Sequence, residues 1–365
     1  LGLIRIFSTF NSIFSEFLGF FIPLIIVGLV TPAISNIGRG AGKILLVTVV
    51  LAYIATLLAG LLSYGVSVST FPSIIADNSA ALYKEAQSAE PAPYFTMSIP
   101  PLMSVMTSLI LSFVLGLGIA YTNSEATKKV FDECGDIVTL VIKNVIIPLL
   151  PLYIFGIFLS MTETGQVAQI LQVFAGIIGI IFLMHIFWLI ALYTVAGVYA
   201  HKNPFVALKN MMPAYFTALG TQSSAATIPV TLAQTIKNGV TEGIAGFVIP
   251  LCATIHLSGS MLKIVACALA LMIMQGNPYS LDLFIGFICM LGVTMVAAPG
   301  VPGGAIMAAL GVLSSMLGFS NQDQALMIAL YIAMDCFGTA CNVTGDGALA
   351  LIIDKMMNKE NALTA

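Results

Sequence analysis

Long charge-free apolar stretches are separated by short polar segments along this chain. Asp, Glu, Lys and Arg are all absent from residues 44–76, 164–200 and 283–322. A run of more than about 18 apolar residues is long enough to cross the hydrocarbon core of a bilayer as a helix. The pattern therefore predicts an all-α polytopic membrane protein, placed in a plasma membrane or a bacterial inner membrane.

Six segments are expected to form membrane helices without a break. A polar, proline-containing stretch at residues 77–101 separates the second and third of these segments and is expected to be a loop. A further apolar segment, residues 243–274, is interrupted at residues 256–260. The six predicted helices are Phe14–Ile34, Lys43–Tyr64, Leu102–Thr122, Glu125–Met161, Val167–Tyr199 and Ala325–Ile353.

Two apolar segments, residues 205–238 and 282–318, contain Gly- and Pro-rich centres at 220–229 and 297–304 that cannot continue a helix. Each arm of about 15 residues would be about 22 Å long, which is short of the roughly 30 Å hydrocarbon core. We therefore expect two re-entrant helical hairpins, whose irregular tips need protein or a water-filled cavity around them. Such paired interruptions are typical of inverted-repeat transporters. Full-length spans kinked at Gly and Pro are the alternative.

Composition agrees with a membrane protein and indicates few other partners. The chain is 59% hydrophobic and 8% charged, with a mean hydropathy of +1.04, whereas soluble domains carry about 25% charged residues. Its net charge of −3 and the lack of a basic run give no indication of nucleic-acid binding. The six cysteines form no C-x-x-C pair or Cys/His cluster, so we expect packing residues, and no cofactor beyond a coupling cation.

The distribution of positive charge predicts the orientation of the chain. If each hairpin returns to its own side, only Lys84 lies in a loop clearly on the other side, beside Glu85 and Glu90. The positive-inside rule makes the side rich in Lys and Arg cytoplasmic. That side carries Arg39, Lys43, Lys128, Lys129, Lys202, Lys209, Lys237, Lys355 and Lys359.

The candidate chemistry lies on the last helix and at the first hairpin tip. Asp335, Thr339, Asn342 and Asp346 are spaced by four, three and four residues, so they share one helical face. An intramembrane carboxylate costs at least about 2.5 kcal/mol and is a functional candidate by default, although structural ion pairing would also explain it. Oxygen-bearing side chains of this kind suit an ammonium group or a hard cation.

At the first tip, Ser223, Ser224 and Thr227 begin the second arm, where free N–H groups and the positive helix end favour a carboxylate. Close helix packing by small residues is the alternative. Together with Asp335, this tip suits an α-amino acid. His256 and Lys263 in the interrupted segment stay open: His256 as packing residue or proton relay, and Lys263 as a snorkelling side chain or an ion-pair partner of an Asp.

Three motifs in this order resemble the dicarboxylate/amino acid:cation symporters. They are residues 223–229 (Ser-Ser-Ala-Ala-Thr-Ile-Pro), 300–307 (Gly-Val-Pro-Gly-Gly-Ala-Ile-Met) and 342–346 (Asn-Val-Thr-Gly-Asp). The resemblance runs from near residue 14 to about 355 and begins at the second helix of the family, so the first family helix is expected to be absent. It implies a homotrimer that works by an elevator mechanism, with scaffold segments at 1–40 and 102–163 and a transport domain at 41–67 and 166–355.

The resemblance also implies the role of each candidate residue. Asp335 would hold the amino group of the substrate, and the second tip would help to hold the α-carboxylate. A sodium ion would lie among the residues of the interrupted segment and the last helix. The implied substrate residues are Ser223, Ser224, Thr227, Val301, Pro302, Gly303, Asp335, Gly338, Thr339 and Asn342, and the implied cation residues are Cys252, His256, Asn342 and Asp346.

Two departures from the family pattern bear on specificity and coupling. Members that carry acidic substrates have Arg at the position of Gly338, so an uncharged, roomier pocket and a neutral amino acid are expected here. Ser258 replaces a cation-binding carboxylate, so at least one sodium site is expected to be lost. The alternatives are an acidic amino acid or dicarboxylate symporter, or a sodium-independent transporter driven by protons or exchange.

Two other functional classes compete with a transporter. A channel would not need a gated binding site. The two predicted hairpins favour such a site and therefore favour a transporter over a channel. A membrane enzyme could use Ser223 or Ser224 as a nucleophile, but no recognisable motif places a His or Lys base beside them. We therefore expect a secondary transporter in the lipid bilayer and no enzymatic activity.

Overall fold

The computed structural model describes residues 2–37, 42–75, 92–163, 167–296, 298 and 303–364. These residues form helices and turns without a strand. Six of their segments are long and apolar enough to cross a membrane, which confirms the predicted all-α polytopic membrane class. The helices are α1 (Gly2–Ile37), α2 (Gly42–Ile74), α4 (Val105–Thr122), α5 (Glu125–Val141), η1 (Ile142–Ile146), α6 (Ile147–Glu163), α7 (Val167–Ala200), α8 (Pro204–Asn210), α9 (Met212–Thr221), α10 (Ser224–Lys237), α11 (Glu242–Ile255), α12 (Ser258–Gln275), α13 (Leu281–Met295), α14 (Gly304–Leu317), α15 (Asn321–Ala333) and α16 (Asp335–Thr364).

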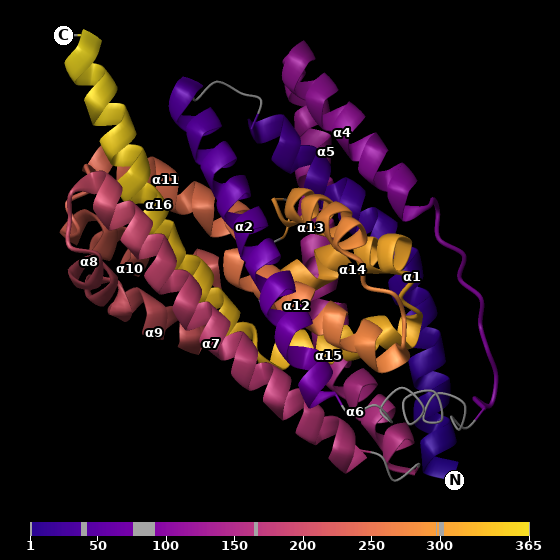
Figure 1. The fold of residues 1–365 in the computed structure, drawn as a ribbon. Helices are drawn as coiled ribbons and strands as arrows, with labels where there is room; N and C mark the ends of the chain where they lie inside the picture. The colour runs from indigo at the N-terminus through magenta and orange to yellow at the C-terminus, as the bar shows by residue number, and fades with distance from the viewer. Residues whose placement is uncertain are drawn as a thin grey trace.

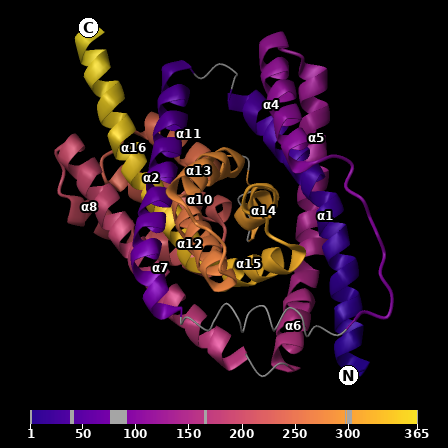
Figure 2. The same ribbon diagram turned by 45° about the vertical axis from the view of Figure 1, so that its right-hand side comes forward.

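The helices form two groups in space (Figures 1 and 2). One group consists of α1 with α4, α5 and α6, which all pack on α1. In the other group, α12 packs on α2 and α16, and α16 also contacts α7, α9, α10 and α11. The start of α2, the α4–α5 connection and the C-terminus lie at one end of the molecule, and the N-terminus lies at the other (Figure 2). The lysines that begin α2 and α5 therefore share one end.

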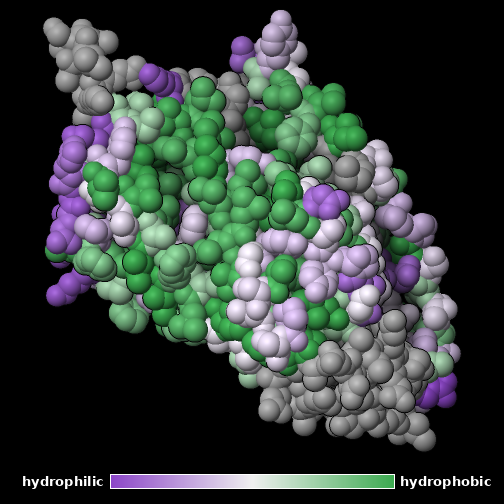
Figure 3. Space-filling view, in the orientation of Figure 1, coloured by the Kyte–Doolittle hydropathy of each residue, from purple (hydrophilic) through white to green (hydrophobic). Residues whose placement is uncertain are grey.

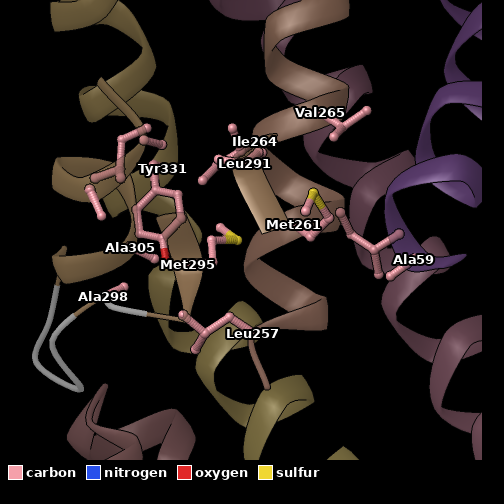
Figure 4. Packing of buried hydrophobic residues seen from close by; sticks show 14 of the residues in the cluster. Ala59, Leu257, Met261, Ile264, Val265, Leu291, Met295, Ala298, Ala305 and Tyr331 are labelled. Atoms are coloured by element: carbon pink, nitrogen blue, oxygen red, sulfur yellow. The ribbon is translucent and has the colours of Figure 1, made fainter. Parts of the chain in front are cut away.

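Helix α12 lies at the centre of the second group. Every residue from 258 to 272 is buried, as expected of a helix that is apolar on all sides. Figure 4 shows Met261 directed toward Ala59 of α2, while Leu291 and Met295 of α13 and Tyr331 of α15 lie on the other side of α12. A polar side chain on α12 is therefore enclosed by protein rather than by lipid.

The outer helices present apolar side chains outward. On α2, Leu46, Val50, Ile54 and Leu58 are exposed and are spaced by four residues, so they form one stripe along the helix. Hydrophobic residues cover a broad area across the middle of the face in Figure 3, and the strongly hydrophilic ones lie mainly toward its edges. This surface suits the hydrocarbon core of a bilayer.

Both predicted hairpin segments contain a break between packed helices. α9 and α10 are separated at Gln222, which has a positive φ of 53°, and at Ser223; α13 and α14 also pack together. The first segment differs from two simple arms, because α8 ends at Asn210 and α9 starts at Met212. Pro213 stands in the first turn of α9, where its missing N–H does not continue the preceding helix.

The prediction of one continuous helix at 325–353 is wrong, because α15 ends at Ala333 and α16 begins at Asp335. Neither Gly nor Pro lies at this break. At the break, the Met334 N–H donates to the Tyr331 carbonyl at 3.2 Å. The Met334 carbonyl accepts the N–H of Gly338 at 3.2 Å and the ammonium of Lys263 at 3.4 Å. The break in α11–α12 at His256 and Leu257, by contrast, lies in the interruption predicted at 256–260.

Candidate functional site

Asp335 joins three separate elements at the start of α16. Its Oδ1 lies 3.2 Å from Nζ of Lys263 on α12, and its Oδ2 accepts the N–H of Gly303, which precedes α14, at 2.7 Å. The carboxylate is only 3% exposed. The structure therefore places this buried carboxylate beside Gly303 of the second predicted tip, and the carboxylate already has a cationic partner within the chain.

Lys263 is enclosed completely. Its side chain is 0% exposed, and its Nζ contacts Asp335, the Met334 carbonyl at 3.4 Å and the ring of Tyr331 at 3.5 Å from the centroid. A buried ammonium is costly unless it is paired and hydrogen bonded, and the aromatic face adds a further attraction. Of the two readings of Lys263, the structure has the ion pair with an Asp and not a snorkelling side chain.

The space beside Gly338 is filled by Lys263. A Cβ added at Gly338 would lie 2.5 Å from Nζ of Lys263 and would also overlap its Cε. The prediction of an open, uncharged pocket at this position is therefore wrong. Because glycine has no side chain, α16 leaves room for a cation that reaches the site from α12.

Asn342 fixes the start of α12. Its Oδ1 accepts the N–H of Gly259 at 2.7 Å and of Ser260 at 3.4 Å, and its Nδ2 lies 3.2 Å from Oγ of Ser260. The Ser260 hydroxyl also hydrogen bonds to the Tyr331 hydroxyl at 2.8 Å. This network satisfies N–H groups that would otherwise be orphans at a buried helix start. Thr339, predicted beside Asn342, is buried on the same face of α16.

Asp346 pairs with His256 one turn further along α16. Asp346 Oδ1 and His256 Nδ1 are 2.9 Å apart, and both side chains are buried. The N–H of His256 donates to the Cys252 carbonyl at 2.9 Å, so three of the four residues predicted to bind a cation lie together. An ionised carboxylate can only accept a hydrogen bond, so the proton of this contact then lies on Nδ1. His256 Nε2 is buried without a partner among the described residues.

The first predicted tip lies against α16. Ser223 caps α10, because its Oγ accepts the N–H of Ala226 at 3.2 Å, while Thr227 Oγ1 donates to the Ser223 carbonyl at 2.8 Å. Ser224 and Thr227 are buried, and both α9 and α10 pack on α16. Val301 and Pro302 of the second tip lie outside the described residues, so the structure places only Gly303 of that tip beside Asp335.

Comparison with known proteins shows the family. Residues 2–356 match the sodium:dicarboxylate symporter family. The chain belongs to this family. It is 29% identical over 278 residues to excitatory amino acid transporter 1 of Rattus norvegicus (74% of this chain and 50% of that protein). It is 36% identical over 166 residues to excitatory amino acid transporter 5 of Homo sapiens (44% and 29%).

A third relative is excitatory amino acid transporter 3 of Mus musculus, with 36% identity over 177 residues (47% of this chain and 33% of that protein). The chain thus spans about half or less of the length of these relatives. The matched family is one of transporters, and the helices are those of a multi-pass cell membrane protein. The predicted resemblance is therefore confirmed.

Two residues around this candidate site were not predicted from the sequence. Tyr331 places its ring over Lys263 and its hydroxyl on Ser260, and His185 of α7 has Nε2 3.0 Å from the Gly259 carbonyl. Tyr331 precedes Asp335 by four residues, so the polar stripe could have been extended by one turn to include it. His185 stands in an apolar helix, and only the tertiary contact with α12 reveals its position.

Proposed function

We propose that this chain is a secondary active transporter that couples the movement of a small amino acid or dicarboxylate to that of a cation. The buried Asp335, between Gly303 and Lys263, is the observation that carries this proposal. Its neighbourhood combines a carboxylate, a helix start and a broken helix, which are the means by which transporters bind charged solutes at the membrane midplane. Gly303, Asp335 and Thr339, with Ser223 and Ser224 at the first tip, are the proposed contacts of the solute, and Lys263 covers Gly338.

We infer that the transport mechanism is of the elevator type, in a homotrimer. The group α1, α4, α5 and α6 would be the scaffold, and the group around α12 and α16 would carry the solute. The packing of α4, α5 and α6 on α1, and of the helices around α12 and α16 on one another, supports this division, and α14 and α15 contact the scaffold group. The breaks in 205–238 and 282–318 are proposed to be the tips of re-entrant hairpins, because neither helix arm at a break is long enough to span a bilayer alone.

The proposed coupling cation is sodium, as in the name of the family, with fewer ions bound than by a member that has a carboxylate at position 258. Two contacts support the smaller number. Asp346 has the His256 ring at 2.9 Å, and the Asn342 oxygen accepts two N–H groups of α12. Oxygens that are engaged by donors of the protein are less available to a cation, which requires them as ligands.

The test is uptake of a panel of radiolabelled solutes into proteoliposomes that contain the purified protein. The panel is aspartate, glutamate, serine, alanine and succinate, each with and without an inward sodium gradient. We expect saturable uptake of at least one of them, accumulated above its outside concentration by the gradient. Uptake that rises linearly with solute concentration would indicate a channel, and chemical conversion of the solute would indicate an enzyme; either result contradicts the proposal.

A further inference from the structure

We propose that Lys263 determines the charge of the transported solute through an exchange of ion pairs. The solute ammonium replaces Lys263 on Asp335, and a side-chain carboxylate of the solute binds the released ammonium of Lys263. The solute class is then an amino acid with an acidic side chain. This inference rests on the proposed transport function and adds a residue, on α12, that sets its specificity.

Lys263 is held inside the site by the surrounding helices. Its side chain is 0% exposed, and every residue of α12 from 258 to 272 is buried. The stem of the side chain lies against Gly338 of α16, and Figure 4 shows the enclosing elements on both sides of α12. A lysine near a surface could carry its charge to water, but this one needs an anion inside the protein whenever Asp335 is taken by another cation.

Lys263 contacts the Asp335 carboxylate, which is the group proposed to bind the ammonium of the solute. Nζ is 3.2 Å from Oδ1 of Asp335, whose other oxygen accepts the Gly303 N–H at 2.7 Å. An ammonium of a solute that binds Asp335 must therefore compete with Lys263. The Met334 carbonyl and the Tyr331 ring also hold Nζ, so the lysine keeps two of its contacts during the exchange and stays at the edge of the site.

The charges of the solute decide which buried groups of the site keep a partner. If the α-carboxylate of the solute is held by N–H groups of the tips, a neutral amino acid that takes Asp335 leaves Lys263 as a buried cation without a counter-ion, which is strongly unfavourable. An acidic amino acid supplies one ammonium for Asp335 and one side-chain carboxylate for Lys263, and its α-carboxylate is left for N–H groups of the tips. A dicarboxylate without an amine leaves Lys263 paired with Asp335, so no buried cation is released to bind it. Only the acidic amino acid gives each ionised side chain a partner.

The experiment measures binding of aspartate, alanine, serine and succinate by isothermal titration calorimetry with the purified full chain. We expect the wild type to bind aspartate at least tenfold more tightly than the other three solutes. Lys263→Met, which keeps the buried stem and removes the charge, is expected to lose at least tenfold in aspartate affinity and to gain affinity for alanine and serine. Lys263→Arg is expected to keep the preference for aspartate.

Two results would overturn the inference. One is a wild type that binds alanine or serine as tightly as aspartate, and the other is a Lys263→Met variant that still prefers aspartate as strongly as the wild type. The double variant Lys263→Met/Asp335→Asn removes both charges of the pair, so it separates a loss of charge balance from a loss of binding. It is expected to fold and to lose the increased affinity for alanine and serine that Lys263→Met alone shows. Retention of that gain would also contradict the exchange.

The outcome for specificity can be told apart from the outcome for transport. If the proteoliposomes take up a neutral amino acid against a gradient and Lys263→Met does not change selectivity, transport stands and the role of Lys263 is wrong. If no solute of the panel is bound or accumulated by the wild type, the proposed function itself has failed.

Discussion

The ammonium of Lys263 lies where a side chain at Gly338 would begin. The two residues belong to different helices, α12 and α16, and a Cβ at Gly338 would lie 2.5 Å from Nζ. Because Gly338 of α16 has no side chain, the charged end of Lys263 of α12 can lie against it. The same ammonium contacts the Asp335 carboxylate and the Met334 carbonyl, at the start of α16.

Gly338→Ala is expected to displace Lys263 from Asp335, because the new methyl group overlaps the lysine stem. Overpacking of a filled interior costs about 1–3 kcal/mol, so we expect lower thermal stability in detergent and at least tenfold weaker solute binding. Gly65→Ala is the matched control, because a Cβ there has no neighbour within 4 Å. Equal effects of the two substitutions would contradict the packing of Lys263 against Gly338.

Asn342→Ala is expected to destabilise the start of α12. The substitution leaves the buried N–H groups of Gly259 and Ser260 without their acceptor, and an unsatisfied buried donor costs about 1–3 kcal/mol. The unfolding temperature in detergent measures the loss. Asn342→Asp keeps an acceptor oxygen in the same place and is expected to be closer to the wild type. If the alanine variant is as stable as the wild type, Asn342 does not serve as the cap of α12.

Substrate affinity is expected to depend on sodium with an order of one or less. Asp346 is paired with His256, and Ser258 supplies no carboxylate, so few charged oxygen ligands remain for sodium. The measurement is the dissociation constant of the solute at a series of sodium concentrations, with choline chloride keeping the ionic strength constant. A steep third-order dependence would contradict this prediction, and Ser258→Asp is expected to steepen the dependence.

The two predicted hairpin tips are expected to be reached by water from opposite sides, the first from the cytoplasm and the second from outside. Single cysteines at Ala225 and Val301, with the exposed Cys134 and Cys289 replaced, would be labelled with an impermeant thiol reagent in oriented vesicles. Ala225 is exposed in the structure. Labelling of both positions from the same side in every condition would contradict the inverted arrangement.

Much of the fold follows from the sequence, because apolar runs and Gly- or Pro-rich interruptions mark helices and their breaks locally. The polar stripe on α16 also follows from spacing alone, since residues three or four apart share a helical face. The break at Met334 does not follow from the sequence, because neither Gly nor Pro marks it and the Lys263 contact at its carbonyl comes from another helix. The position of Lys263 beside Gly338 could not be predicted either. It depends on how closely α12 approaches α16, and a local sequence pattern does not give that distance.

Counterflow tests most directly whether Asp335 is the solute-binding carboxylate of a transporter. Proteoliposomes loaded with unlabelled aspartate are placed in trace labelled aspartate with no ion gradient. We predict transient accumulation of label by the wild type and by Asp282→Asn, which changes an exposed carboxylate at the start of α13, and none by Asp335→Asn. Counterflow by a folded Asp335→Asn variant at the wild-type rate would contradict the account.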